Sequence, residues 1–245
     1  LLALGSPGAE AARKAPAAPE APLEGTMAGE FALQAGDLQN AARWYLEAAR
    51  AASGDAGLAE RAARIALLAD DDPRAGEALA LWRDRAPDSL ALRAGEVTLA
   101  LHRQDARAAR RGLEALMKAG PQGETPAGWR YALAALGGGA KDPKLAAQLL
   151  SELVDGGAIP DELQAWLAFG GLAQRLEQPA LAERIVDAVV ARFPDEPRVA
   201  LLHASQLREA GREDEARKVL ANLAKGELSA DLRLSLAAEY DALDE

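Results

Sequence analysis

The residues of this sequence that are able to act in catalysis are few and far apart. The chain of 245 residues contains two histidines, His102 and His203, and no cysteine. Without cysteine, disulfides, zinc ribbons, iron–sulfur clusters and thiol nucleophiles are excluded. Ser205 lies two positions after His203, but on a helix two such side chains do not face each other, so no nucleophile–base pair forms there. We interpret His203 as a core residue and His102 as a surface residue near a helix end.

Two acidic clusters, Asp70-Asp71-Asp72 and Glu213-Asp214-Glu215, have the composition of a cation site. Neither has the alternating ligands, glycine and distal glutamate of a calcium-binding loop. Carboxylates are also favoured at the first turn of a helix, and we interpret both clusters in that way. Gly137-Gly138-Gly139 lacks the Lys-Ser/Thr pair of a phosphate-binding loop. The sequence therefore predicts no catalytic residue, no metal and no cofactor, and a protein that is not an enzyme.

The composition predicts an all-α fold. The chain has 60 Ala and 39 Leu but only 13 Val, Ile and Thr together. Alanine and leucine favour helices, whereas strands favour β-branched residues. The net charge of -10 argues against nucleic acid as a partner, because phosphate binding needs clustered Lys and Arg. No segment has the ~18 consecutive apolar residues of a membrane span.

A repeat organises the chain. Asp37, Asp71 and Asp105 are spaced by 34 and 34 residues, each between two segments with helical periodicity. A period of 34 residues in helix–turn–helix units is typical of the tetratricopeptide repeat. We expect a superhelix of antiparallel helix hairpins, with about six repeats and one extra helix, over residues 22–245. Residues 1–21 are predicted to be an Ala/Pro-rich linker or tail, and we expect the natural protein to continue beyond residue 245.

Small residues recur where the two helices of each predicted hairpin cross. A large side chain at these positions would separate the helices, so we expect them to be buried. They are Ala41, Ala75, Ala109, Ala146, Ala182 and Ala216, with Gly170 at the second kind of crossing position. In the fourth unit, one or two residues are added between Gly137 and Lys141.

Stacked hairpins leave one face of every first helix open to a partner, and this is the first candidate site. At the positions predicted to point inward, the side chains are polar and of both charges, which suits an extended peptide or the edge of a protein. These residues are Glu30, Glu60, Arg64, Thr98, Leu101, Gln174, Ser205 and Arg208.

A second candidate is the densest basic stretch of this acidic chain. Arg103, Arg107, Arg110 and Arg111 are predicted to share one side of a helix, with Lys118 further on. This side either meets an acidic partner or is a solvated outer face. Leu232, Leu234 and Leu236, near the last residue given, either form a binding patch or await a further hairpin.

The segment AGEFALQAGDLQNAARWYLEAARAASGDAGLAERAARIALLADDD resembles the N-terminal part of proteobacterial tetratricopeptide lipoproteins of the outer membrane. The family includes the lipoprotein partner of a periplasmic carboxyl-terminal processing protease. The resemblance covers residues 22–110 well and the rest only as repeats. It implies an adaptor that binds a periplasmic protease and presents cell-wall hydrolases to it. The lipid-bearing cysteine of that family is absent, so the anchor is expected upstream of residue 1.

Three functions remain open. The first is a non-catalytic scaffold in the bacterial envelope, located in the periplasm and attached to the outer membrane only through that anchor. The second is the repeat domain of a larger enzyme whose catalytic domain lies elsewhere. The third is a cytoplasmic scaffold for assembly or secretion. Oligomeric state and the identity of the protein partner are not predicted.

Overall fold

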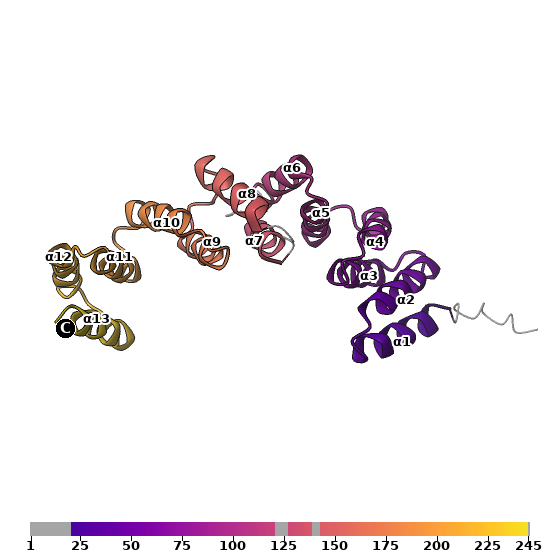
Figure 1. Ribbon diagram of the computed structural model, residues 1–245, viewed down its shortest axis with the longest axis horizontal. Coiled ribbons are helices and arrows are strands. Elements are labelled where there is room, and N and C mark those ends of the chain that lie inside the picture. Colours follow the sequence, from indigo (N-terminus) through magenta and orange to yellow (C-terminus); the bar gives the residue numbers. More distant parts are fainter. Residues whose placement is uncertain (1–20, 121–126, 139–142, 245) are drawn as a thin grey trace, which may run out of the picture. The chain divides into compact units, whose positions relative to one another are not determined.

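The computed structural model describes residues 21–120, 127–138 and 143–244, which contain thirteen α-helices and no strand (Figure 1). The first helices of six successive hairpins are α1 (Ala21–Gln34), α3 (Ala56–Leu68), α5 (Leu90–His102), α7 (Trp129–Gly138), α9 (Leu163–Arg175) and α11 (Pro197–Glu209). The second helices are α2 (Leu38–Ala51), α4 (Asp72–Arg85), α6 (Ala106–Met117), α8 (Pro143–Asp155), α10 (Pro179–Arg192) and α12 (Glu213–Leu223). One further helix, α13 (Ala230–Asp244), follows the last hairpin. The predicted all-α architecture of six hairpins and one extra helix is confirmed.

The helix starts reproduce the 34-residue period. Helices α2, α4 and α6 begin at residues 38, 72 and 106, and α7, α9 and α11 begin at 129, 163 and 197. This is the architecture of the tetratricopeptide repeat. The extra length predicted between residues 137 and 141 lies instead between α6 and α7, where eleven residues, 118–128, separate the two helices.

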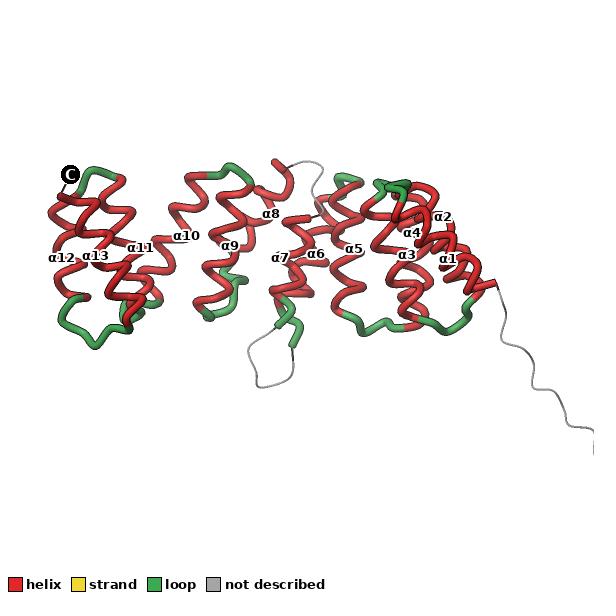
Figure 2. The backbone as a smooth tube through the Cα atoms, turned by 90° about the horizontal axis from the view of Figure 1, so that it is seen from below, coloured by secondary structure: helices red, strands yellow, loops and turns green. Residues whose placement is uncertain are grey.

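The chain divides into two compact units rather than the single array predicted over 22–245. Unit 1 ends at Arg85 and unit 2 begins at Ala86. Unit 1 holds α1 to α4, and unit 2 holds α5 to α13. Within each unit the helices lie side by side, with the described turns at their ends (Figure 2). Residues 1–20 of the predicted linker lie outside the described residues, and Ala21 is already the first residue of α1.

The turn inside a hairpin has a recurring geometry. The aspartates spaced by 34 residues each accept a hydrogen bond from the backbone N–H three residues later, at 2.9–3.1 Å. They therefore cap the second helices, which confirms our interpretation of the aspartate cluster at residues 70–72. The residue before each cap has a left-handed backbone conformation; these residues are Gly36 (φ 74°), Asp70 (φ 57°) and Gln104 (φ 57°).

Small residues bring the two helices of a hairpin together, as predicted. The six alanines expected at the crossings are all at most 8% exposed; they are Ala41, Ala75, Ala109, Ala146, Ala182 and Ala216. In unit 1 a Cβ atom on Gly29 would lie 2.6 Å from the Tyr45 ring, so only glycine is compatible with this packing. In unit 2 a Cβ atom on Gly170 would lie 3.3 Å from Cγ2 of Ile185, which places Gly170 at the crossing of α9 and α10.

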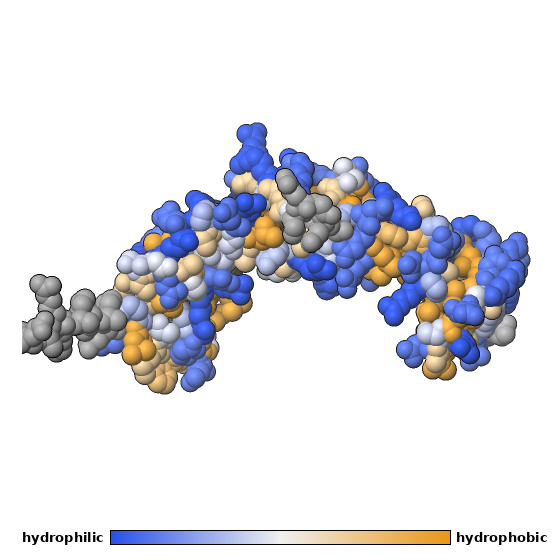
Figure 3. All heavy atoms as spheres, turned by 180° about the vertical axis from the view of Figure 1, so that it is seen from behind, coloured by the Kyte–Doolittle hydropathy of each residue, from blue (hydrophilic) through white to orange (hydrophobic). Residues whose placement is uncertain are grey.

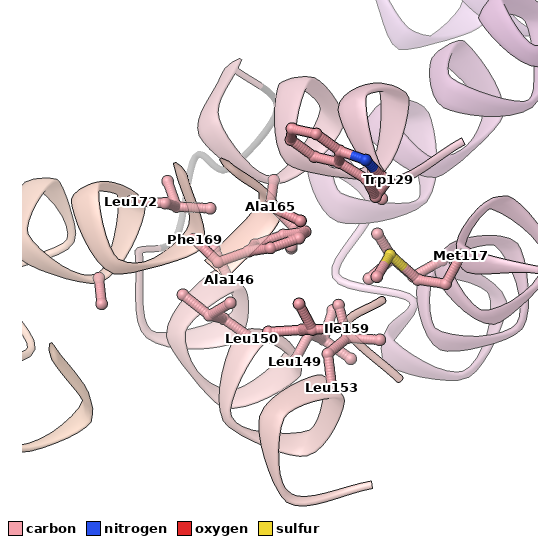
Figure 4. Close-up of a cluster of buried hydrophobic side chains, with 14 of the residues drawn as sticks. Met117, Trp129, Ala146, Leu149, Leu150, Leu153, Ile159, Ala165, Phe169 and Leu172 are labelled. Carbon is pink, nitrogen blue, oxygen red and sulfur yellow. The ribbon is translucent and has the colours of Figure 1, made fainter. Parts of the chain in front are cut away.

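Large apolar side chains fill the core of unit 2 (Figure 4). Trp166 and Phe169 are at most 1% exposed, and the Phe169 ring lies 6.3 Å from that of Trp129, centroid to centroid. This cluster extends from α5 to the start of α11. A second cluster joins α11, α12 and α13, and includes Leu236. Leu234 remains 71% exposed.

Candidate interaction surfaces

In unit 1, Glu30 on α1 belongs to a polar network with a buried tyrosine. The Tyr45 hydroxyl on α2 donates a hydrogen bond to the Glu30 carboxylate, and Arg61 on α3 forms an ion pair with the same carboxylate. The Arg61 guanidinium also lies 4.9 Å from the centre of the Tyr45 ring. Burial, and then the hydrogen bond to Glu30, raises the pKa of Tyr45 to about 12. Glu30 therefore links three helices, and its carboxylate is already engaged within the unit.

Glu60 and Arg64, the other predicted residues of unit 1, satisfy each other. Both lie on α3, and Nη2 of Arg64 lies 2.6 Å from a carboxylate oxygen of Glu60. The Arg64 side chain is 66% exposed and that of Glu60 33%, so water screens the ion pair strongly. A charged partner can compete for either side chain at small cost. These two residues remain accessible members of the first-helix face.

In unit 2, the two predicted residues on α5 do not line an open face. The hydroxyl of Thr98 donates to the carbonyl oxygen of Ala94, 3.1 Å away on the same helix. Leu101 is 1% exposed and belongs to the hydrophobic core, so the prediction that it faces a partner is wrong. The physical reason is that α5 packs against both α6 and α7, which cover this side of the helix.

The predicted residues of α9 and α11 are brought closer together. Gln174, Ser205 and His203 line one shallow groove of about 480 Å³ between the α9–α10 hairpin and α11. Arg208 donates to the Ser205 hydroxyl at 3.4 Å and pairs with Glu239 of α13, also at 3.4 Å. His203 is half-buried at this groove, not a core residue as predicted. His102 is the last residue of α5, as expected.

The basic stretch is split between a turn and a helix. Arg103 caps the end of α5 and does not lie on α6, so the prediction that four arginines share one helical side is wrong for this residue. The physical reason is the left-handed turn at Gln104, which ends one helix before the next begins. Arg107, Arg110 and Arg111 are exposed and spaced by three and four residues on α6, so these three do share a face.

Arg110 already binds a carboxylate. Its Nε and Nη2 atoms donate to the two oxygens of Glu152 on α8, each at 2.7 Å. Gln148 donates to Glu152 as well, at 3.0 Å. The bond from Arg110, followed by that from Gln148, lowers the pKa of Glu152 from its ordinary value.

The sequence interpretation missed an apolar stripe on α1. Leu23, Met27 and Phe31, spaced by four residues, are 65%, 51% and 64% exposed. Figure 3 shows hydrophobic surface along this helix of unit 1. A sequence signal for the stripe exists, because Gly25 and Gly29 mark the side of α1 that packs on α2. Apolar residues on the other side are then left without a neighbour within the hairpin.

The described residues hold no group of three or more His, Cys, Asp or Glu side chains suited to a metal ion. Glu213, Asp214 and Glu215 occupy the first turn of α12, as interpreted from the sequence. Over the described part of the chain, the helices are too short or too polar to span a bilayer.

Comparison with known proteins gives similarity of structure only. No protein family model and no curated protein matches the chain. Among solved structures, the MamA protein is similar with 14% identity and a TM-score of 0.36, over 86% of this chain and 97% of that one. PilF of Pseudomonas aeruginosa is similar with 14% identity and a TM-score of 0.40, over 90% and 98%. The assignment of the tetratricopeptide fold rests on the 34-residue period and the hairpin packing of this chain itself.

Proposed function

We propose that this chain is a non-catalytic scaffold for protein–protein interaction, acting as an adaptor in the bacterial cell envelope. In this role it binds a periplasmic protease, presents cell-wall hydrolases to it, and is held at the outer membrane by a lipid anchor upstream of residue 1. The partners are proteins, without nucleic acid and without a cofactor.

The observation that carries the interaction role is the exposed stripe of Leu23, Met27 and Phe31 on α1. The three side chains span two helical turns, or about 12 Å. Soluble proteins seldom leave contiguous apolar surface uncovered unless it contacts another molecule. The polar first-helix residues Glu60 and Arg64 lie in the same unit and add adjustable charge.

The envelope role is supported by the resemblance of residues 22–110 to the outer-membrane lipoproteins. That resemblance lies mainly in unit 1, the unit that carries the apolar stripe. A protease and its substrates need separate surfaces on one adaptor, and a repeat array provides several because each hairpin presents its own.

The full-length protein, purified from its native envelope, tests the proposal. We expect a pull-down to recover a periplasmic protease together with cell-wall hydrolases. The double variant Met27→Ser/Phe31→Ser should lose the protease, whereas Leu68→Ser, which changes a single side chain that is 67% exposed, should retain it. All three positions are at the surface, so folding is expected to be unaffected.

The alternatives give different results in the same experiment. Recovery of cytoplasmic assembly proteins alone would contradict the envelope role. A catalytic domain fused to the repeat array in the full-length protein would instead make it a targeting domain of an enzyme. Equal recovery with the stripe variant and with Leu68→Ser would show that α1 is not the contact surface.

A further inference from the structure

A groove separates two second helices of unit 2, α6 and α8. Its volume is about 700 Å³, and its floor is formed by Leu113 and Met117 of α6 with Leu149 and Leu153 of α8. The eleven-residue connection between α6 and α7 replaces the four-residue connection found between α4 and α5. The longer connection allows α6 and α8 to stand apart at this end.

The rim of the groove already demonstrates how α6 recognises a carboxylate. Arg110 holds Glu152 through two parallel hydrogen bonds of 2.7 Å, the bidentate geometry that makes arginine–carboxylate pairs strong and specific. This pair crosses the groove from α6 to α8.

Two further arginines flank that pair and are not engaged in the same way. Arg107 and Arg111 are exposed, and neither forms an ion pair or hydrogen bond with another residue in the described ranges. Lys118, just after α6, also lines the groove. In a chain of net charge -10, this face therefore has an excess of positive charge.

We propose that the α6–α8 groove binds an acidic amphipathic helix of a partner protein. Apolar side chains of that helix lie over the floor between Met117 and Leu153, and its carboxylates pair with Arg107, Arg111 and Lys118. The inference rests on the interaction role proposed above, but it concerns a different unit and does not require an envelope partner.

A helix is favoured over an anionic membrane by the shape and the charges of the site. A groove between two helices with an apolar floor and charged rims matches the recognition of amphipathic helices. A flat anionic surface would meet the carboxylates of Glu114 and Glu152 together with the arginines, and these carboxylates would repel it. An acidic helix is able to place its charges beside the arginines alone.

The first experiment uses the purified chain and a synthetic peptide of about five helical turns, or ~18 residues. The peptide has leucines at i, i+3, i+4 and i+7 and glutamates on the opposite side. We expect saturable binding by fluorescence anisotropy, weakened by salt because the contacts are exposed ion pairs. A peptide of the same composition in scrambled order, without an apolar face, should bind at least about tenfold more weakly, since it cannot cover the floor of the groove.

The second experiment changes the chain. Arg107→Gln/Arg111→Gln should weaken binding of the amphipathic peptide by at least about tenfold, since it removes two charge pairs. The control Arg43→Gln/Lys218→Gln removes the same net charge from exposed sites on α2 and α12, and should change binding by less than about twofold. Circular dichroism checks that both double variants remain folded.

Three results would overturn the proposal. They are no binding of the amphipathic peptide to the wild-type chain, equal binding of the scrambled peptide, and equal loss in the two double variants. Retention of the chain by vesicles of phosphatidylcholine and phosphatidylglycerol, with no peptide binding, would assign the basic face to lipid instead. Because purified components are used, failure here leaves the pull-down with α1 variants as a separate test.

Discussion

Unit 1 and unit 2 repeat the same hairpin but fill its interior with different side chains. Alanine accounts for eleven of the sixteen buried hydrophobic residues of unit 1, and for eleven of the thirty-six in the described part of unit 2. Alanine lets helix backbones approach closely, whereas Leu, Phe and Trp hold helices apart and interlock. Unit 1 therefore depends on the absence of side-chain volume, and unit 2 depends on its presence.

The same difference explains where the candidate surfaces lie. In unit 1 close packing leaves the outer side of α1 as the accessible apolar feature, and the network of Glu30, Tyr45 and Arg61 closes the inner side. In unit 2 the larger side chains and longer connections leave grooves between helices, including the one between α6 and α8.

The largest expected effect is the loss of volume from unit 2. Phe169→Ala removes a side chain that is 0% exposed, and we expect it to lower the free energy of unfolding by about 3–5 kcal/mol. In unit 1, Ala63→Gly should cost only about 1 kcal/mol, chiefly through helix propensity. Urea unfolding combined with hydrogen exchange of α9 and α3 measures the two effects. Similar costs for the two variants would contradict the contrast between the units.

Adding volume should reverse the order of sensitivity. Gly29→Ala places a Cβ atom 2.6 Å from the buried Tyr45 ring, and we expect a loss of about 1–3 kcal/mol from overpacking. Gly170→Ala meets Ile185 at 3.3 Å, so a small shift suffices, and the gain of about 1 kcal/mol in helix propensity offsets it. Thermal unfolding of the two variants is the measurement. A destabilised Gly170→Ala beside a neutral Gly29→Ala would show that unit 2 is the more tightly packed unit.

The polar network of unit 1 gives a prediction about pH. The pKa of Tyr45, about 12, lies above the ordinary value of 10.0, so the folded state holds this proton more tightly than the unfolded state. The stabilisation is complete below pH 10 and is lost as the pH rises through 12. Of the three tyrosines, one should therefore form tyrosinate late in an alkaline absorbance titration.

Tyr45→Phe provides the control for that titration. It should abolish the late step and lower the free energy of unfolding by about 1.5–3 kcal/mol, the range for a hydrogen bond to a charged group. Three tyrosines that titrate together near pH 10 in the folded protein would refute the role of burial and Glu30.

The sequence contained the period, the crossing alanines and the aspartate caps, because each is local and recurs. It did not contain the burial of Leu101, which depends on two neighbouring helices covering α5 at once. The position of Arg103 was missed because the end of a helix is set by a left-handed turn, and here Gln104, not glycine, adopts it. The groove between α6 and α8 arises from hairpin spacing, which no pattern within a single repeat records.

The smallest effect concerns that turn position, which differs between the units in residue type but not in geometry. Gly36 in unit 1 and Gln104 in unit 2 have φ values of 74° and 57°. A side chain in this conformation costs roughly 1 kcal/mol relative to glycine. Gly36→Ala should therefore destabilise unit 1 by about 1 kcal/mol, although a Cβ atom there would meet nothing within 4 Å. Gln104→Gly should stabilise unit 2 by up to about 1 kcal/mol, less the entropy that glycine loses on folding. Urea midpoints measured for both variants decide the matter: opposite signs mean that the turn conformation controls the cost, whereas two losses mean that the Gln104 side chain contributes contacts of its own.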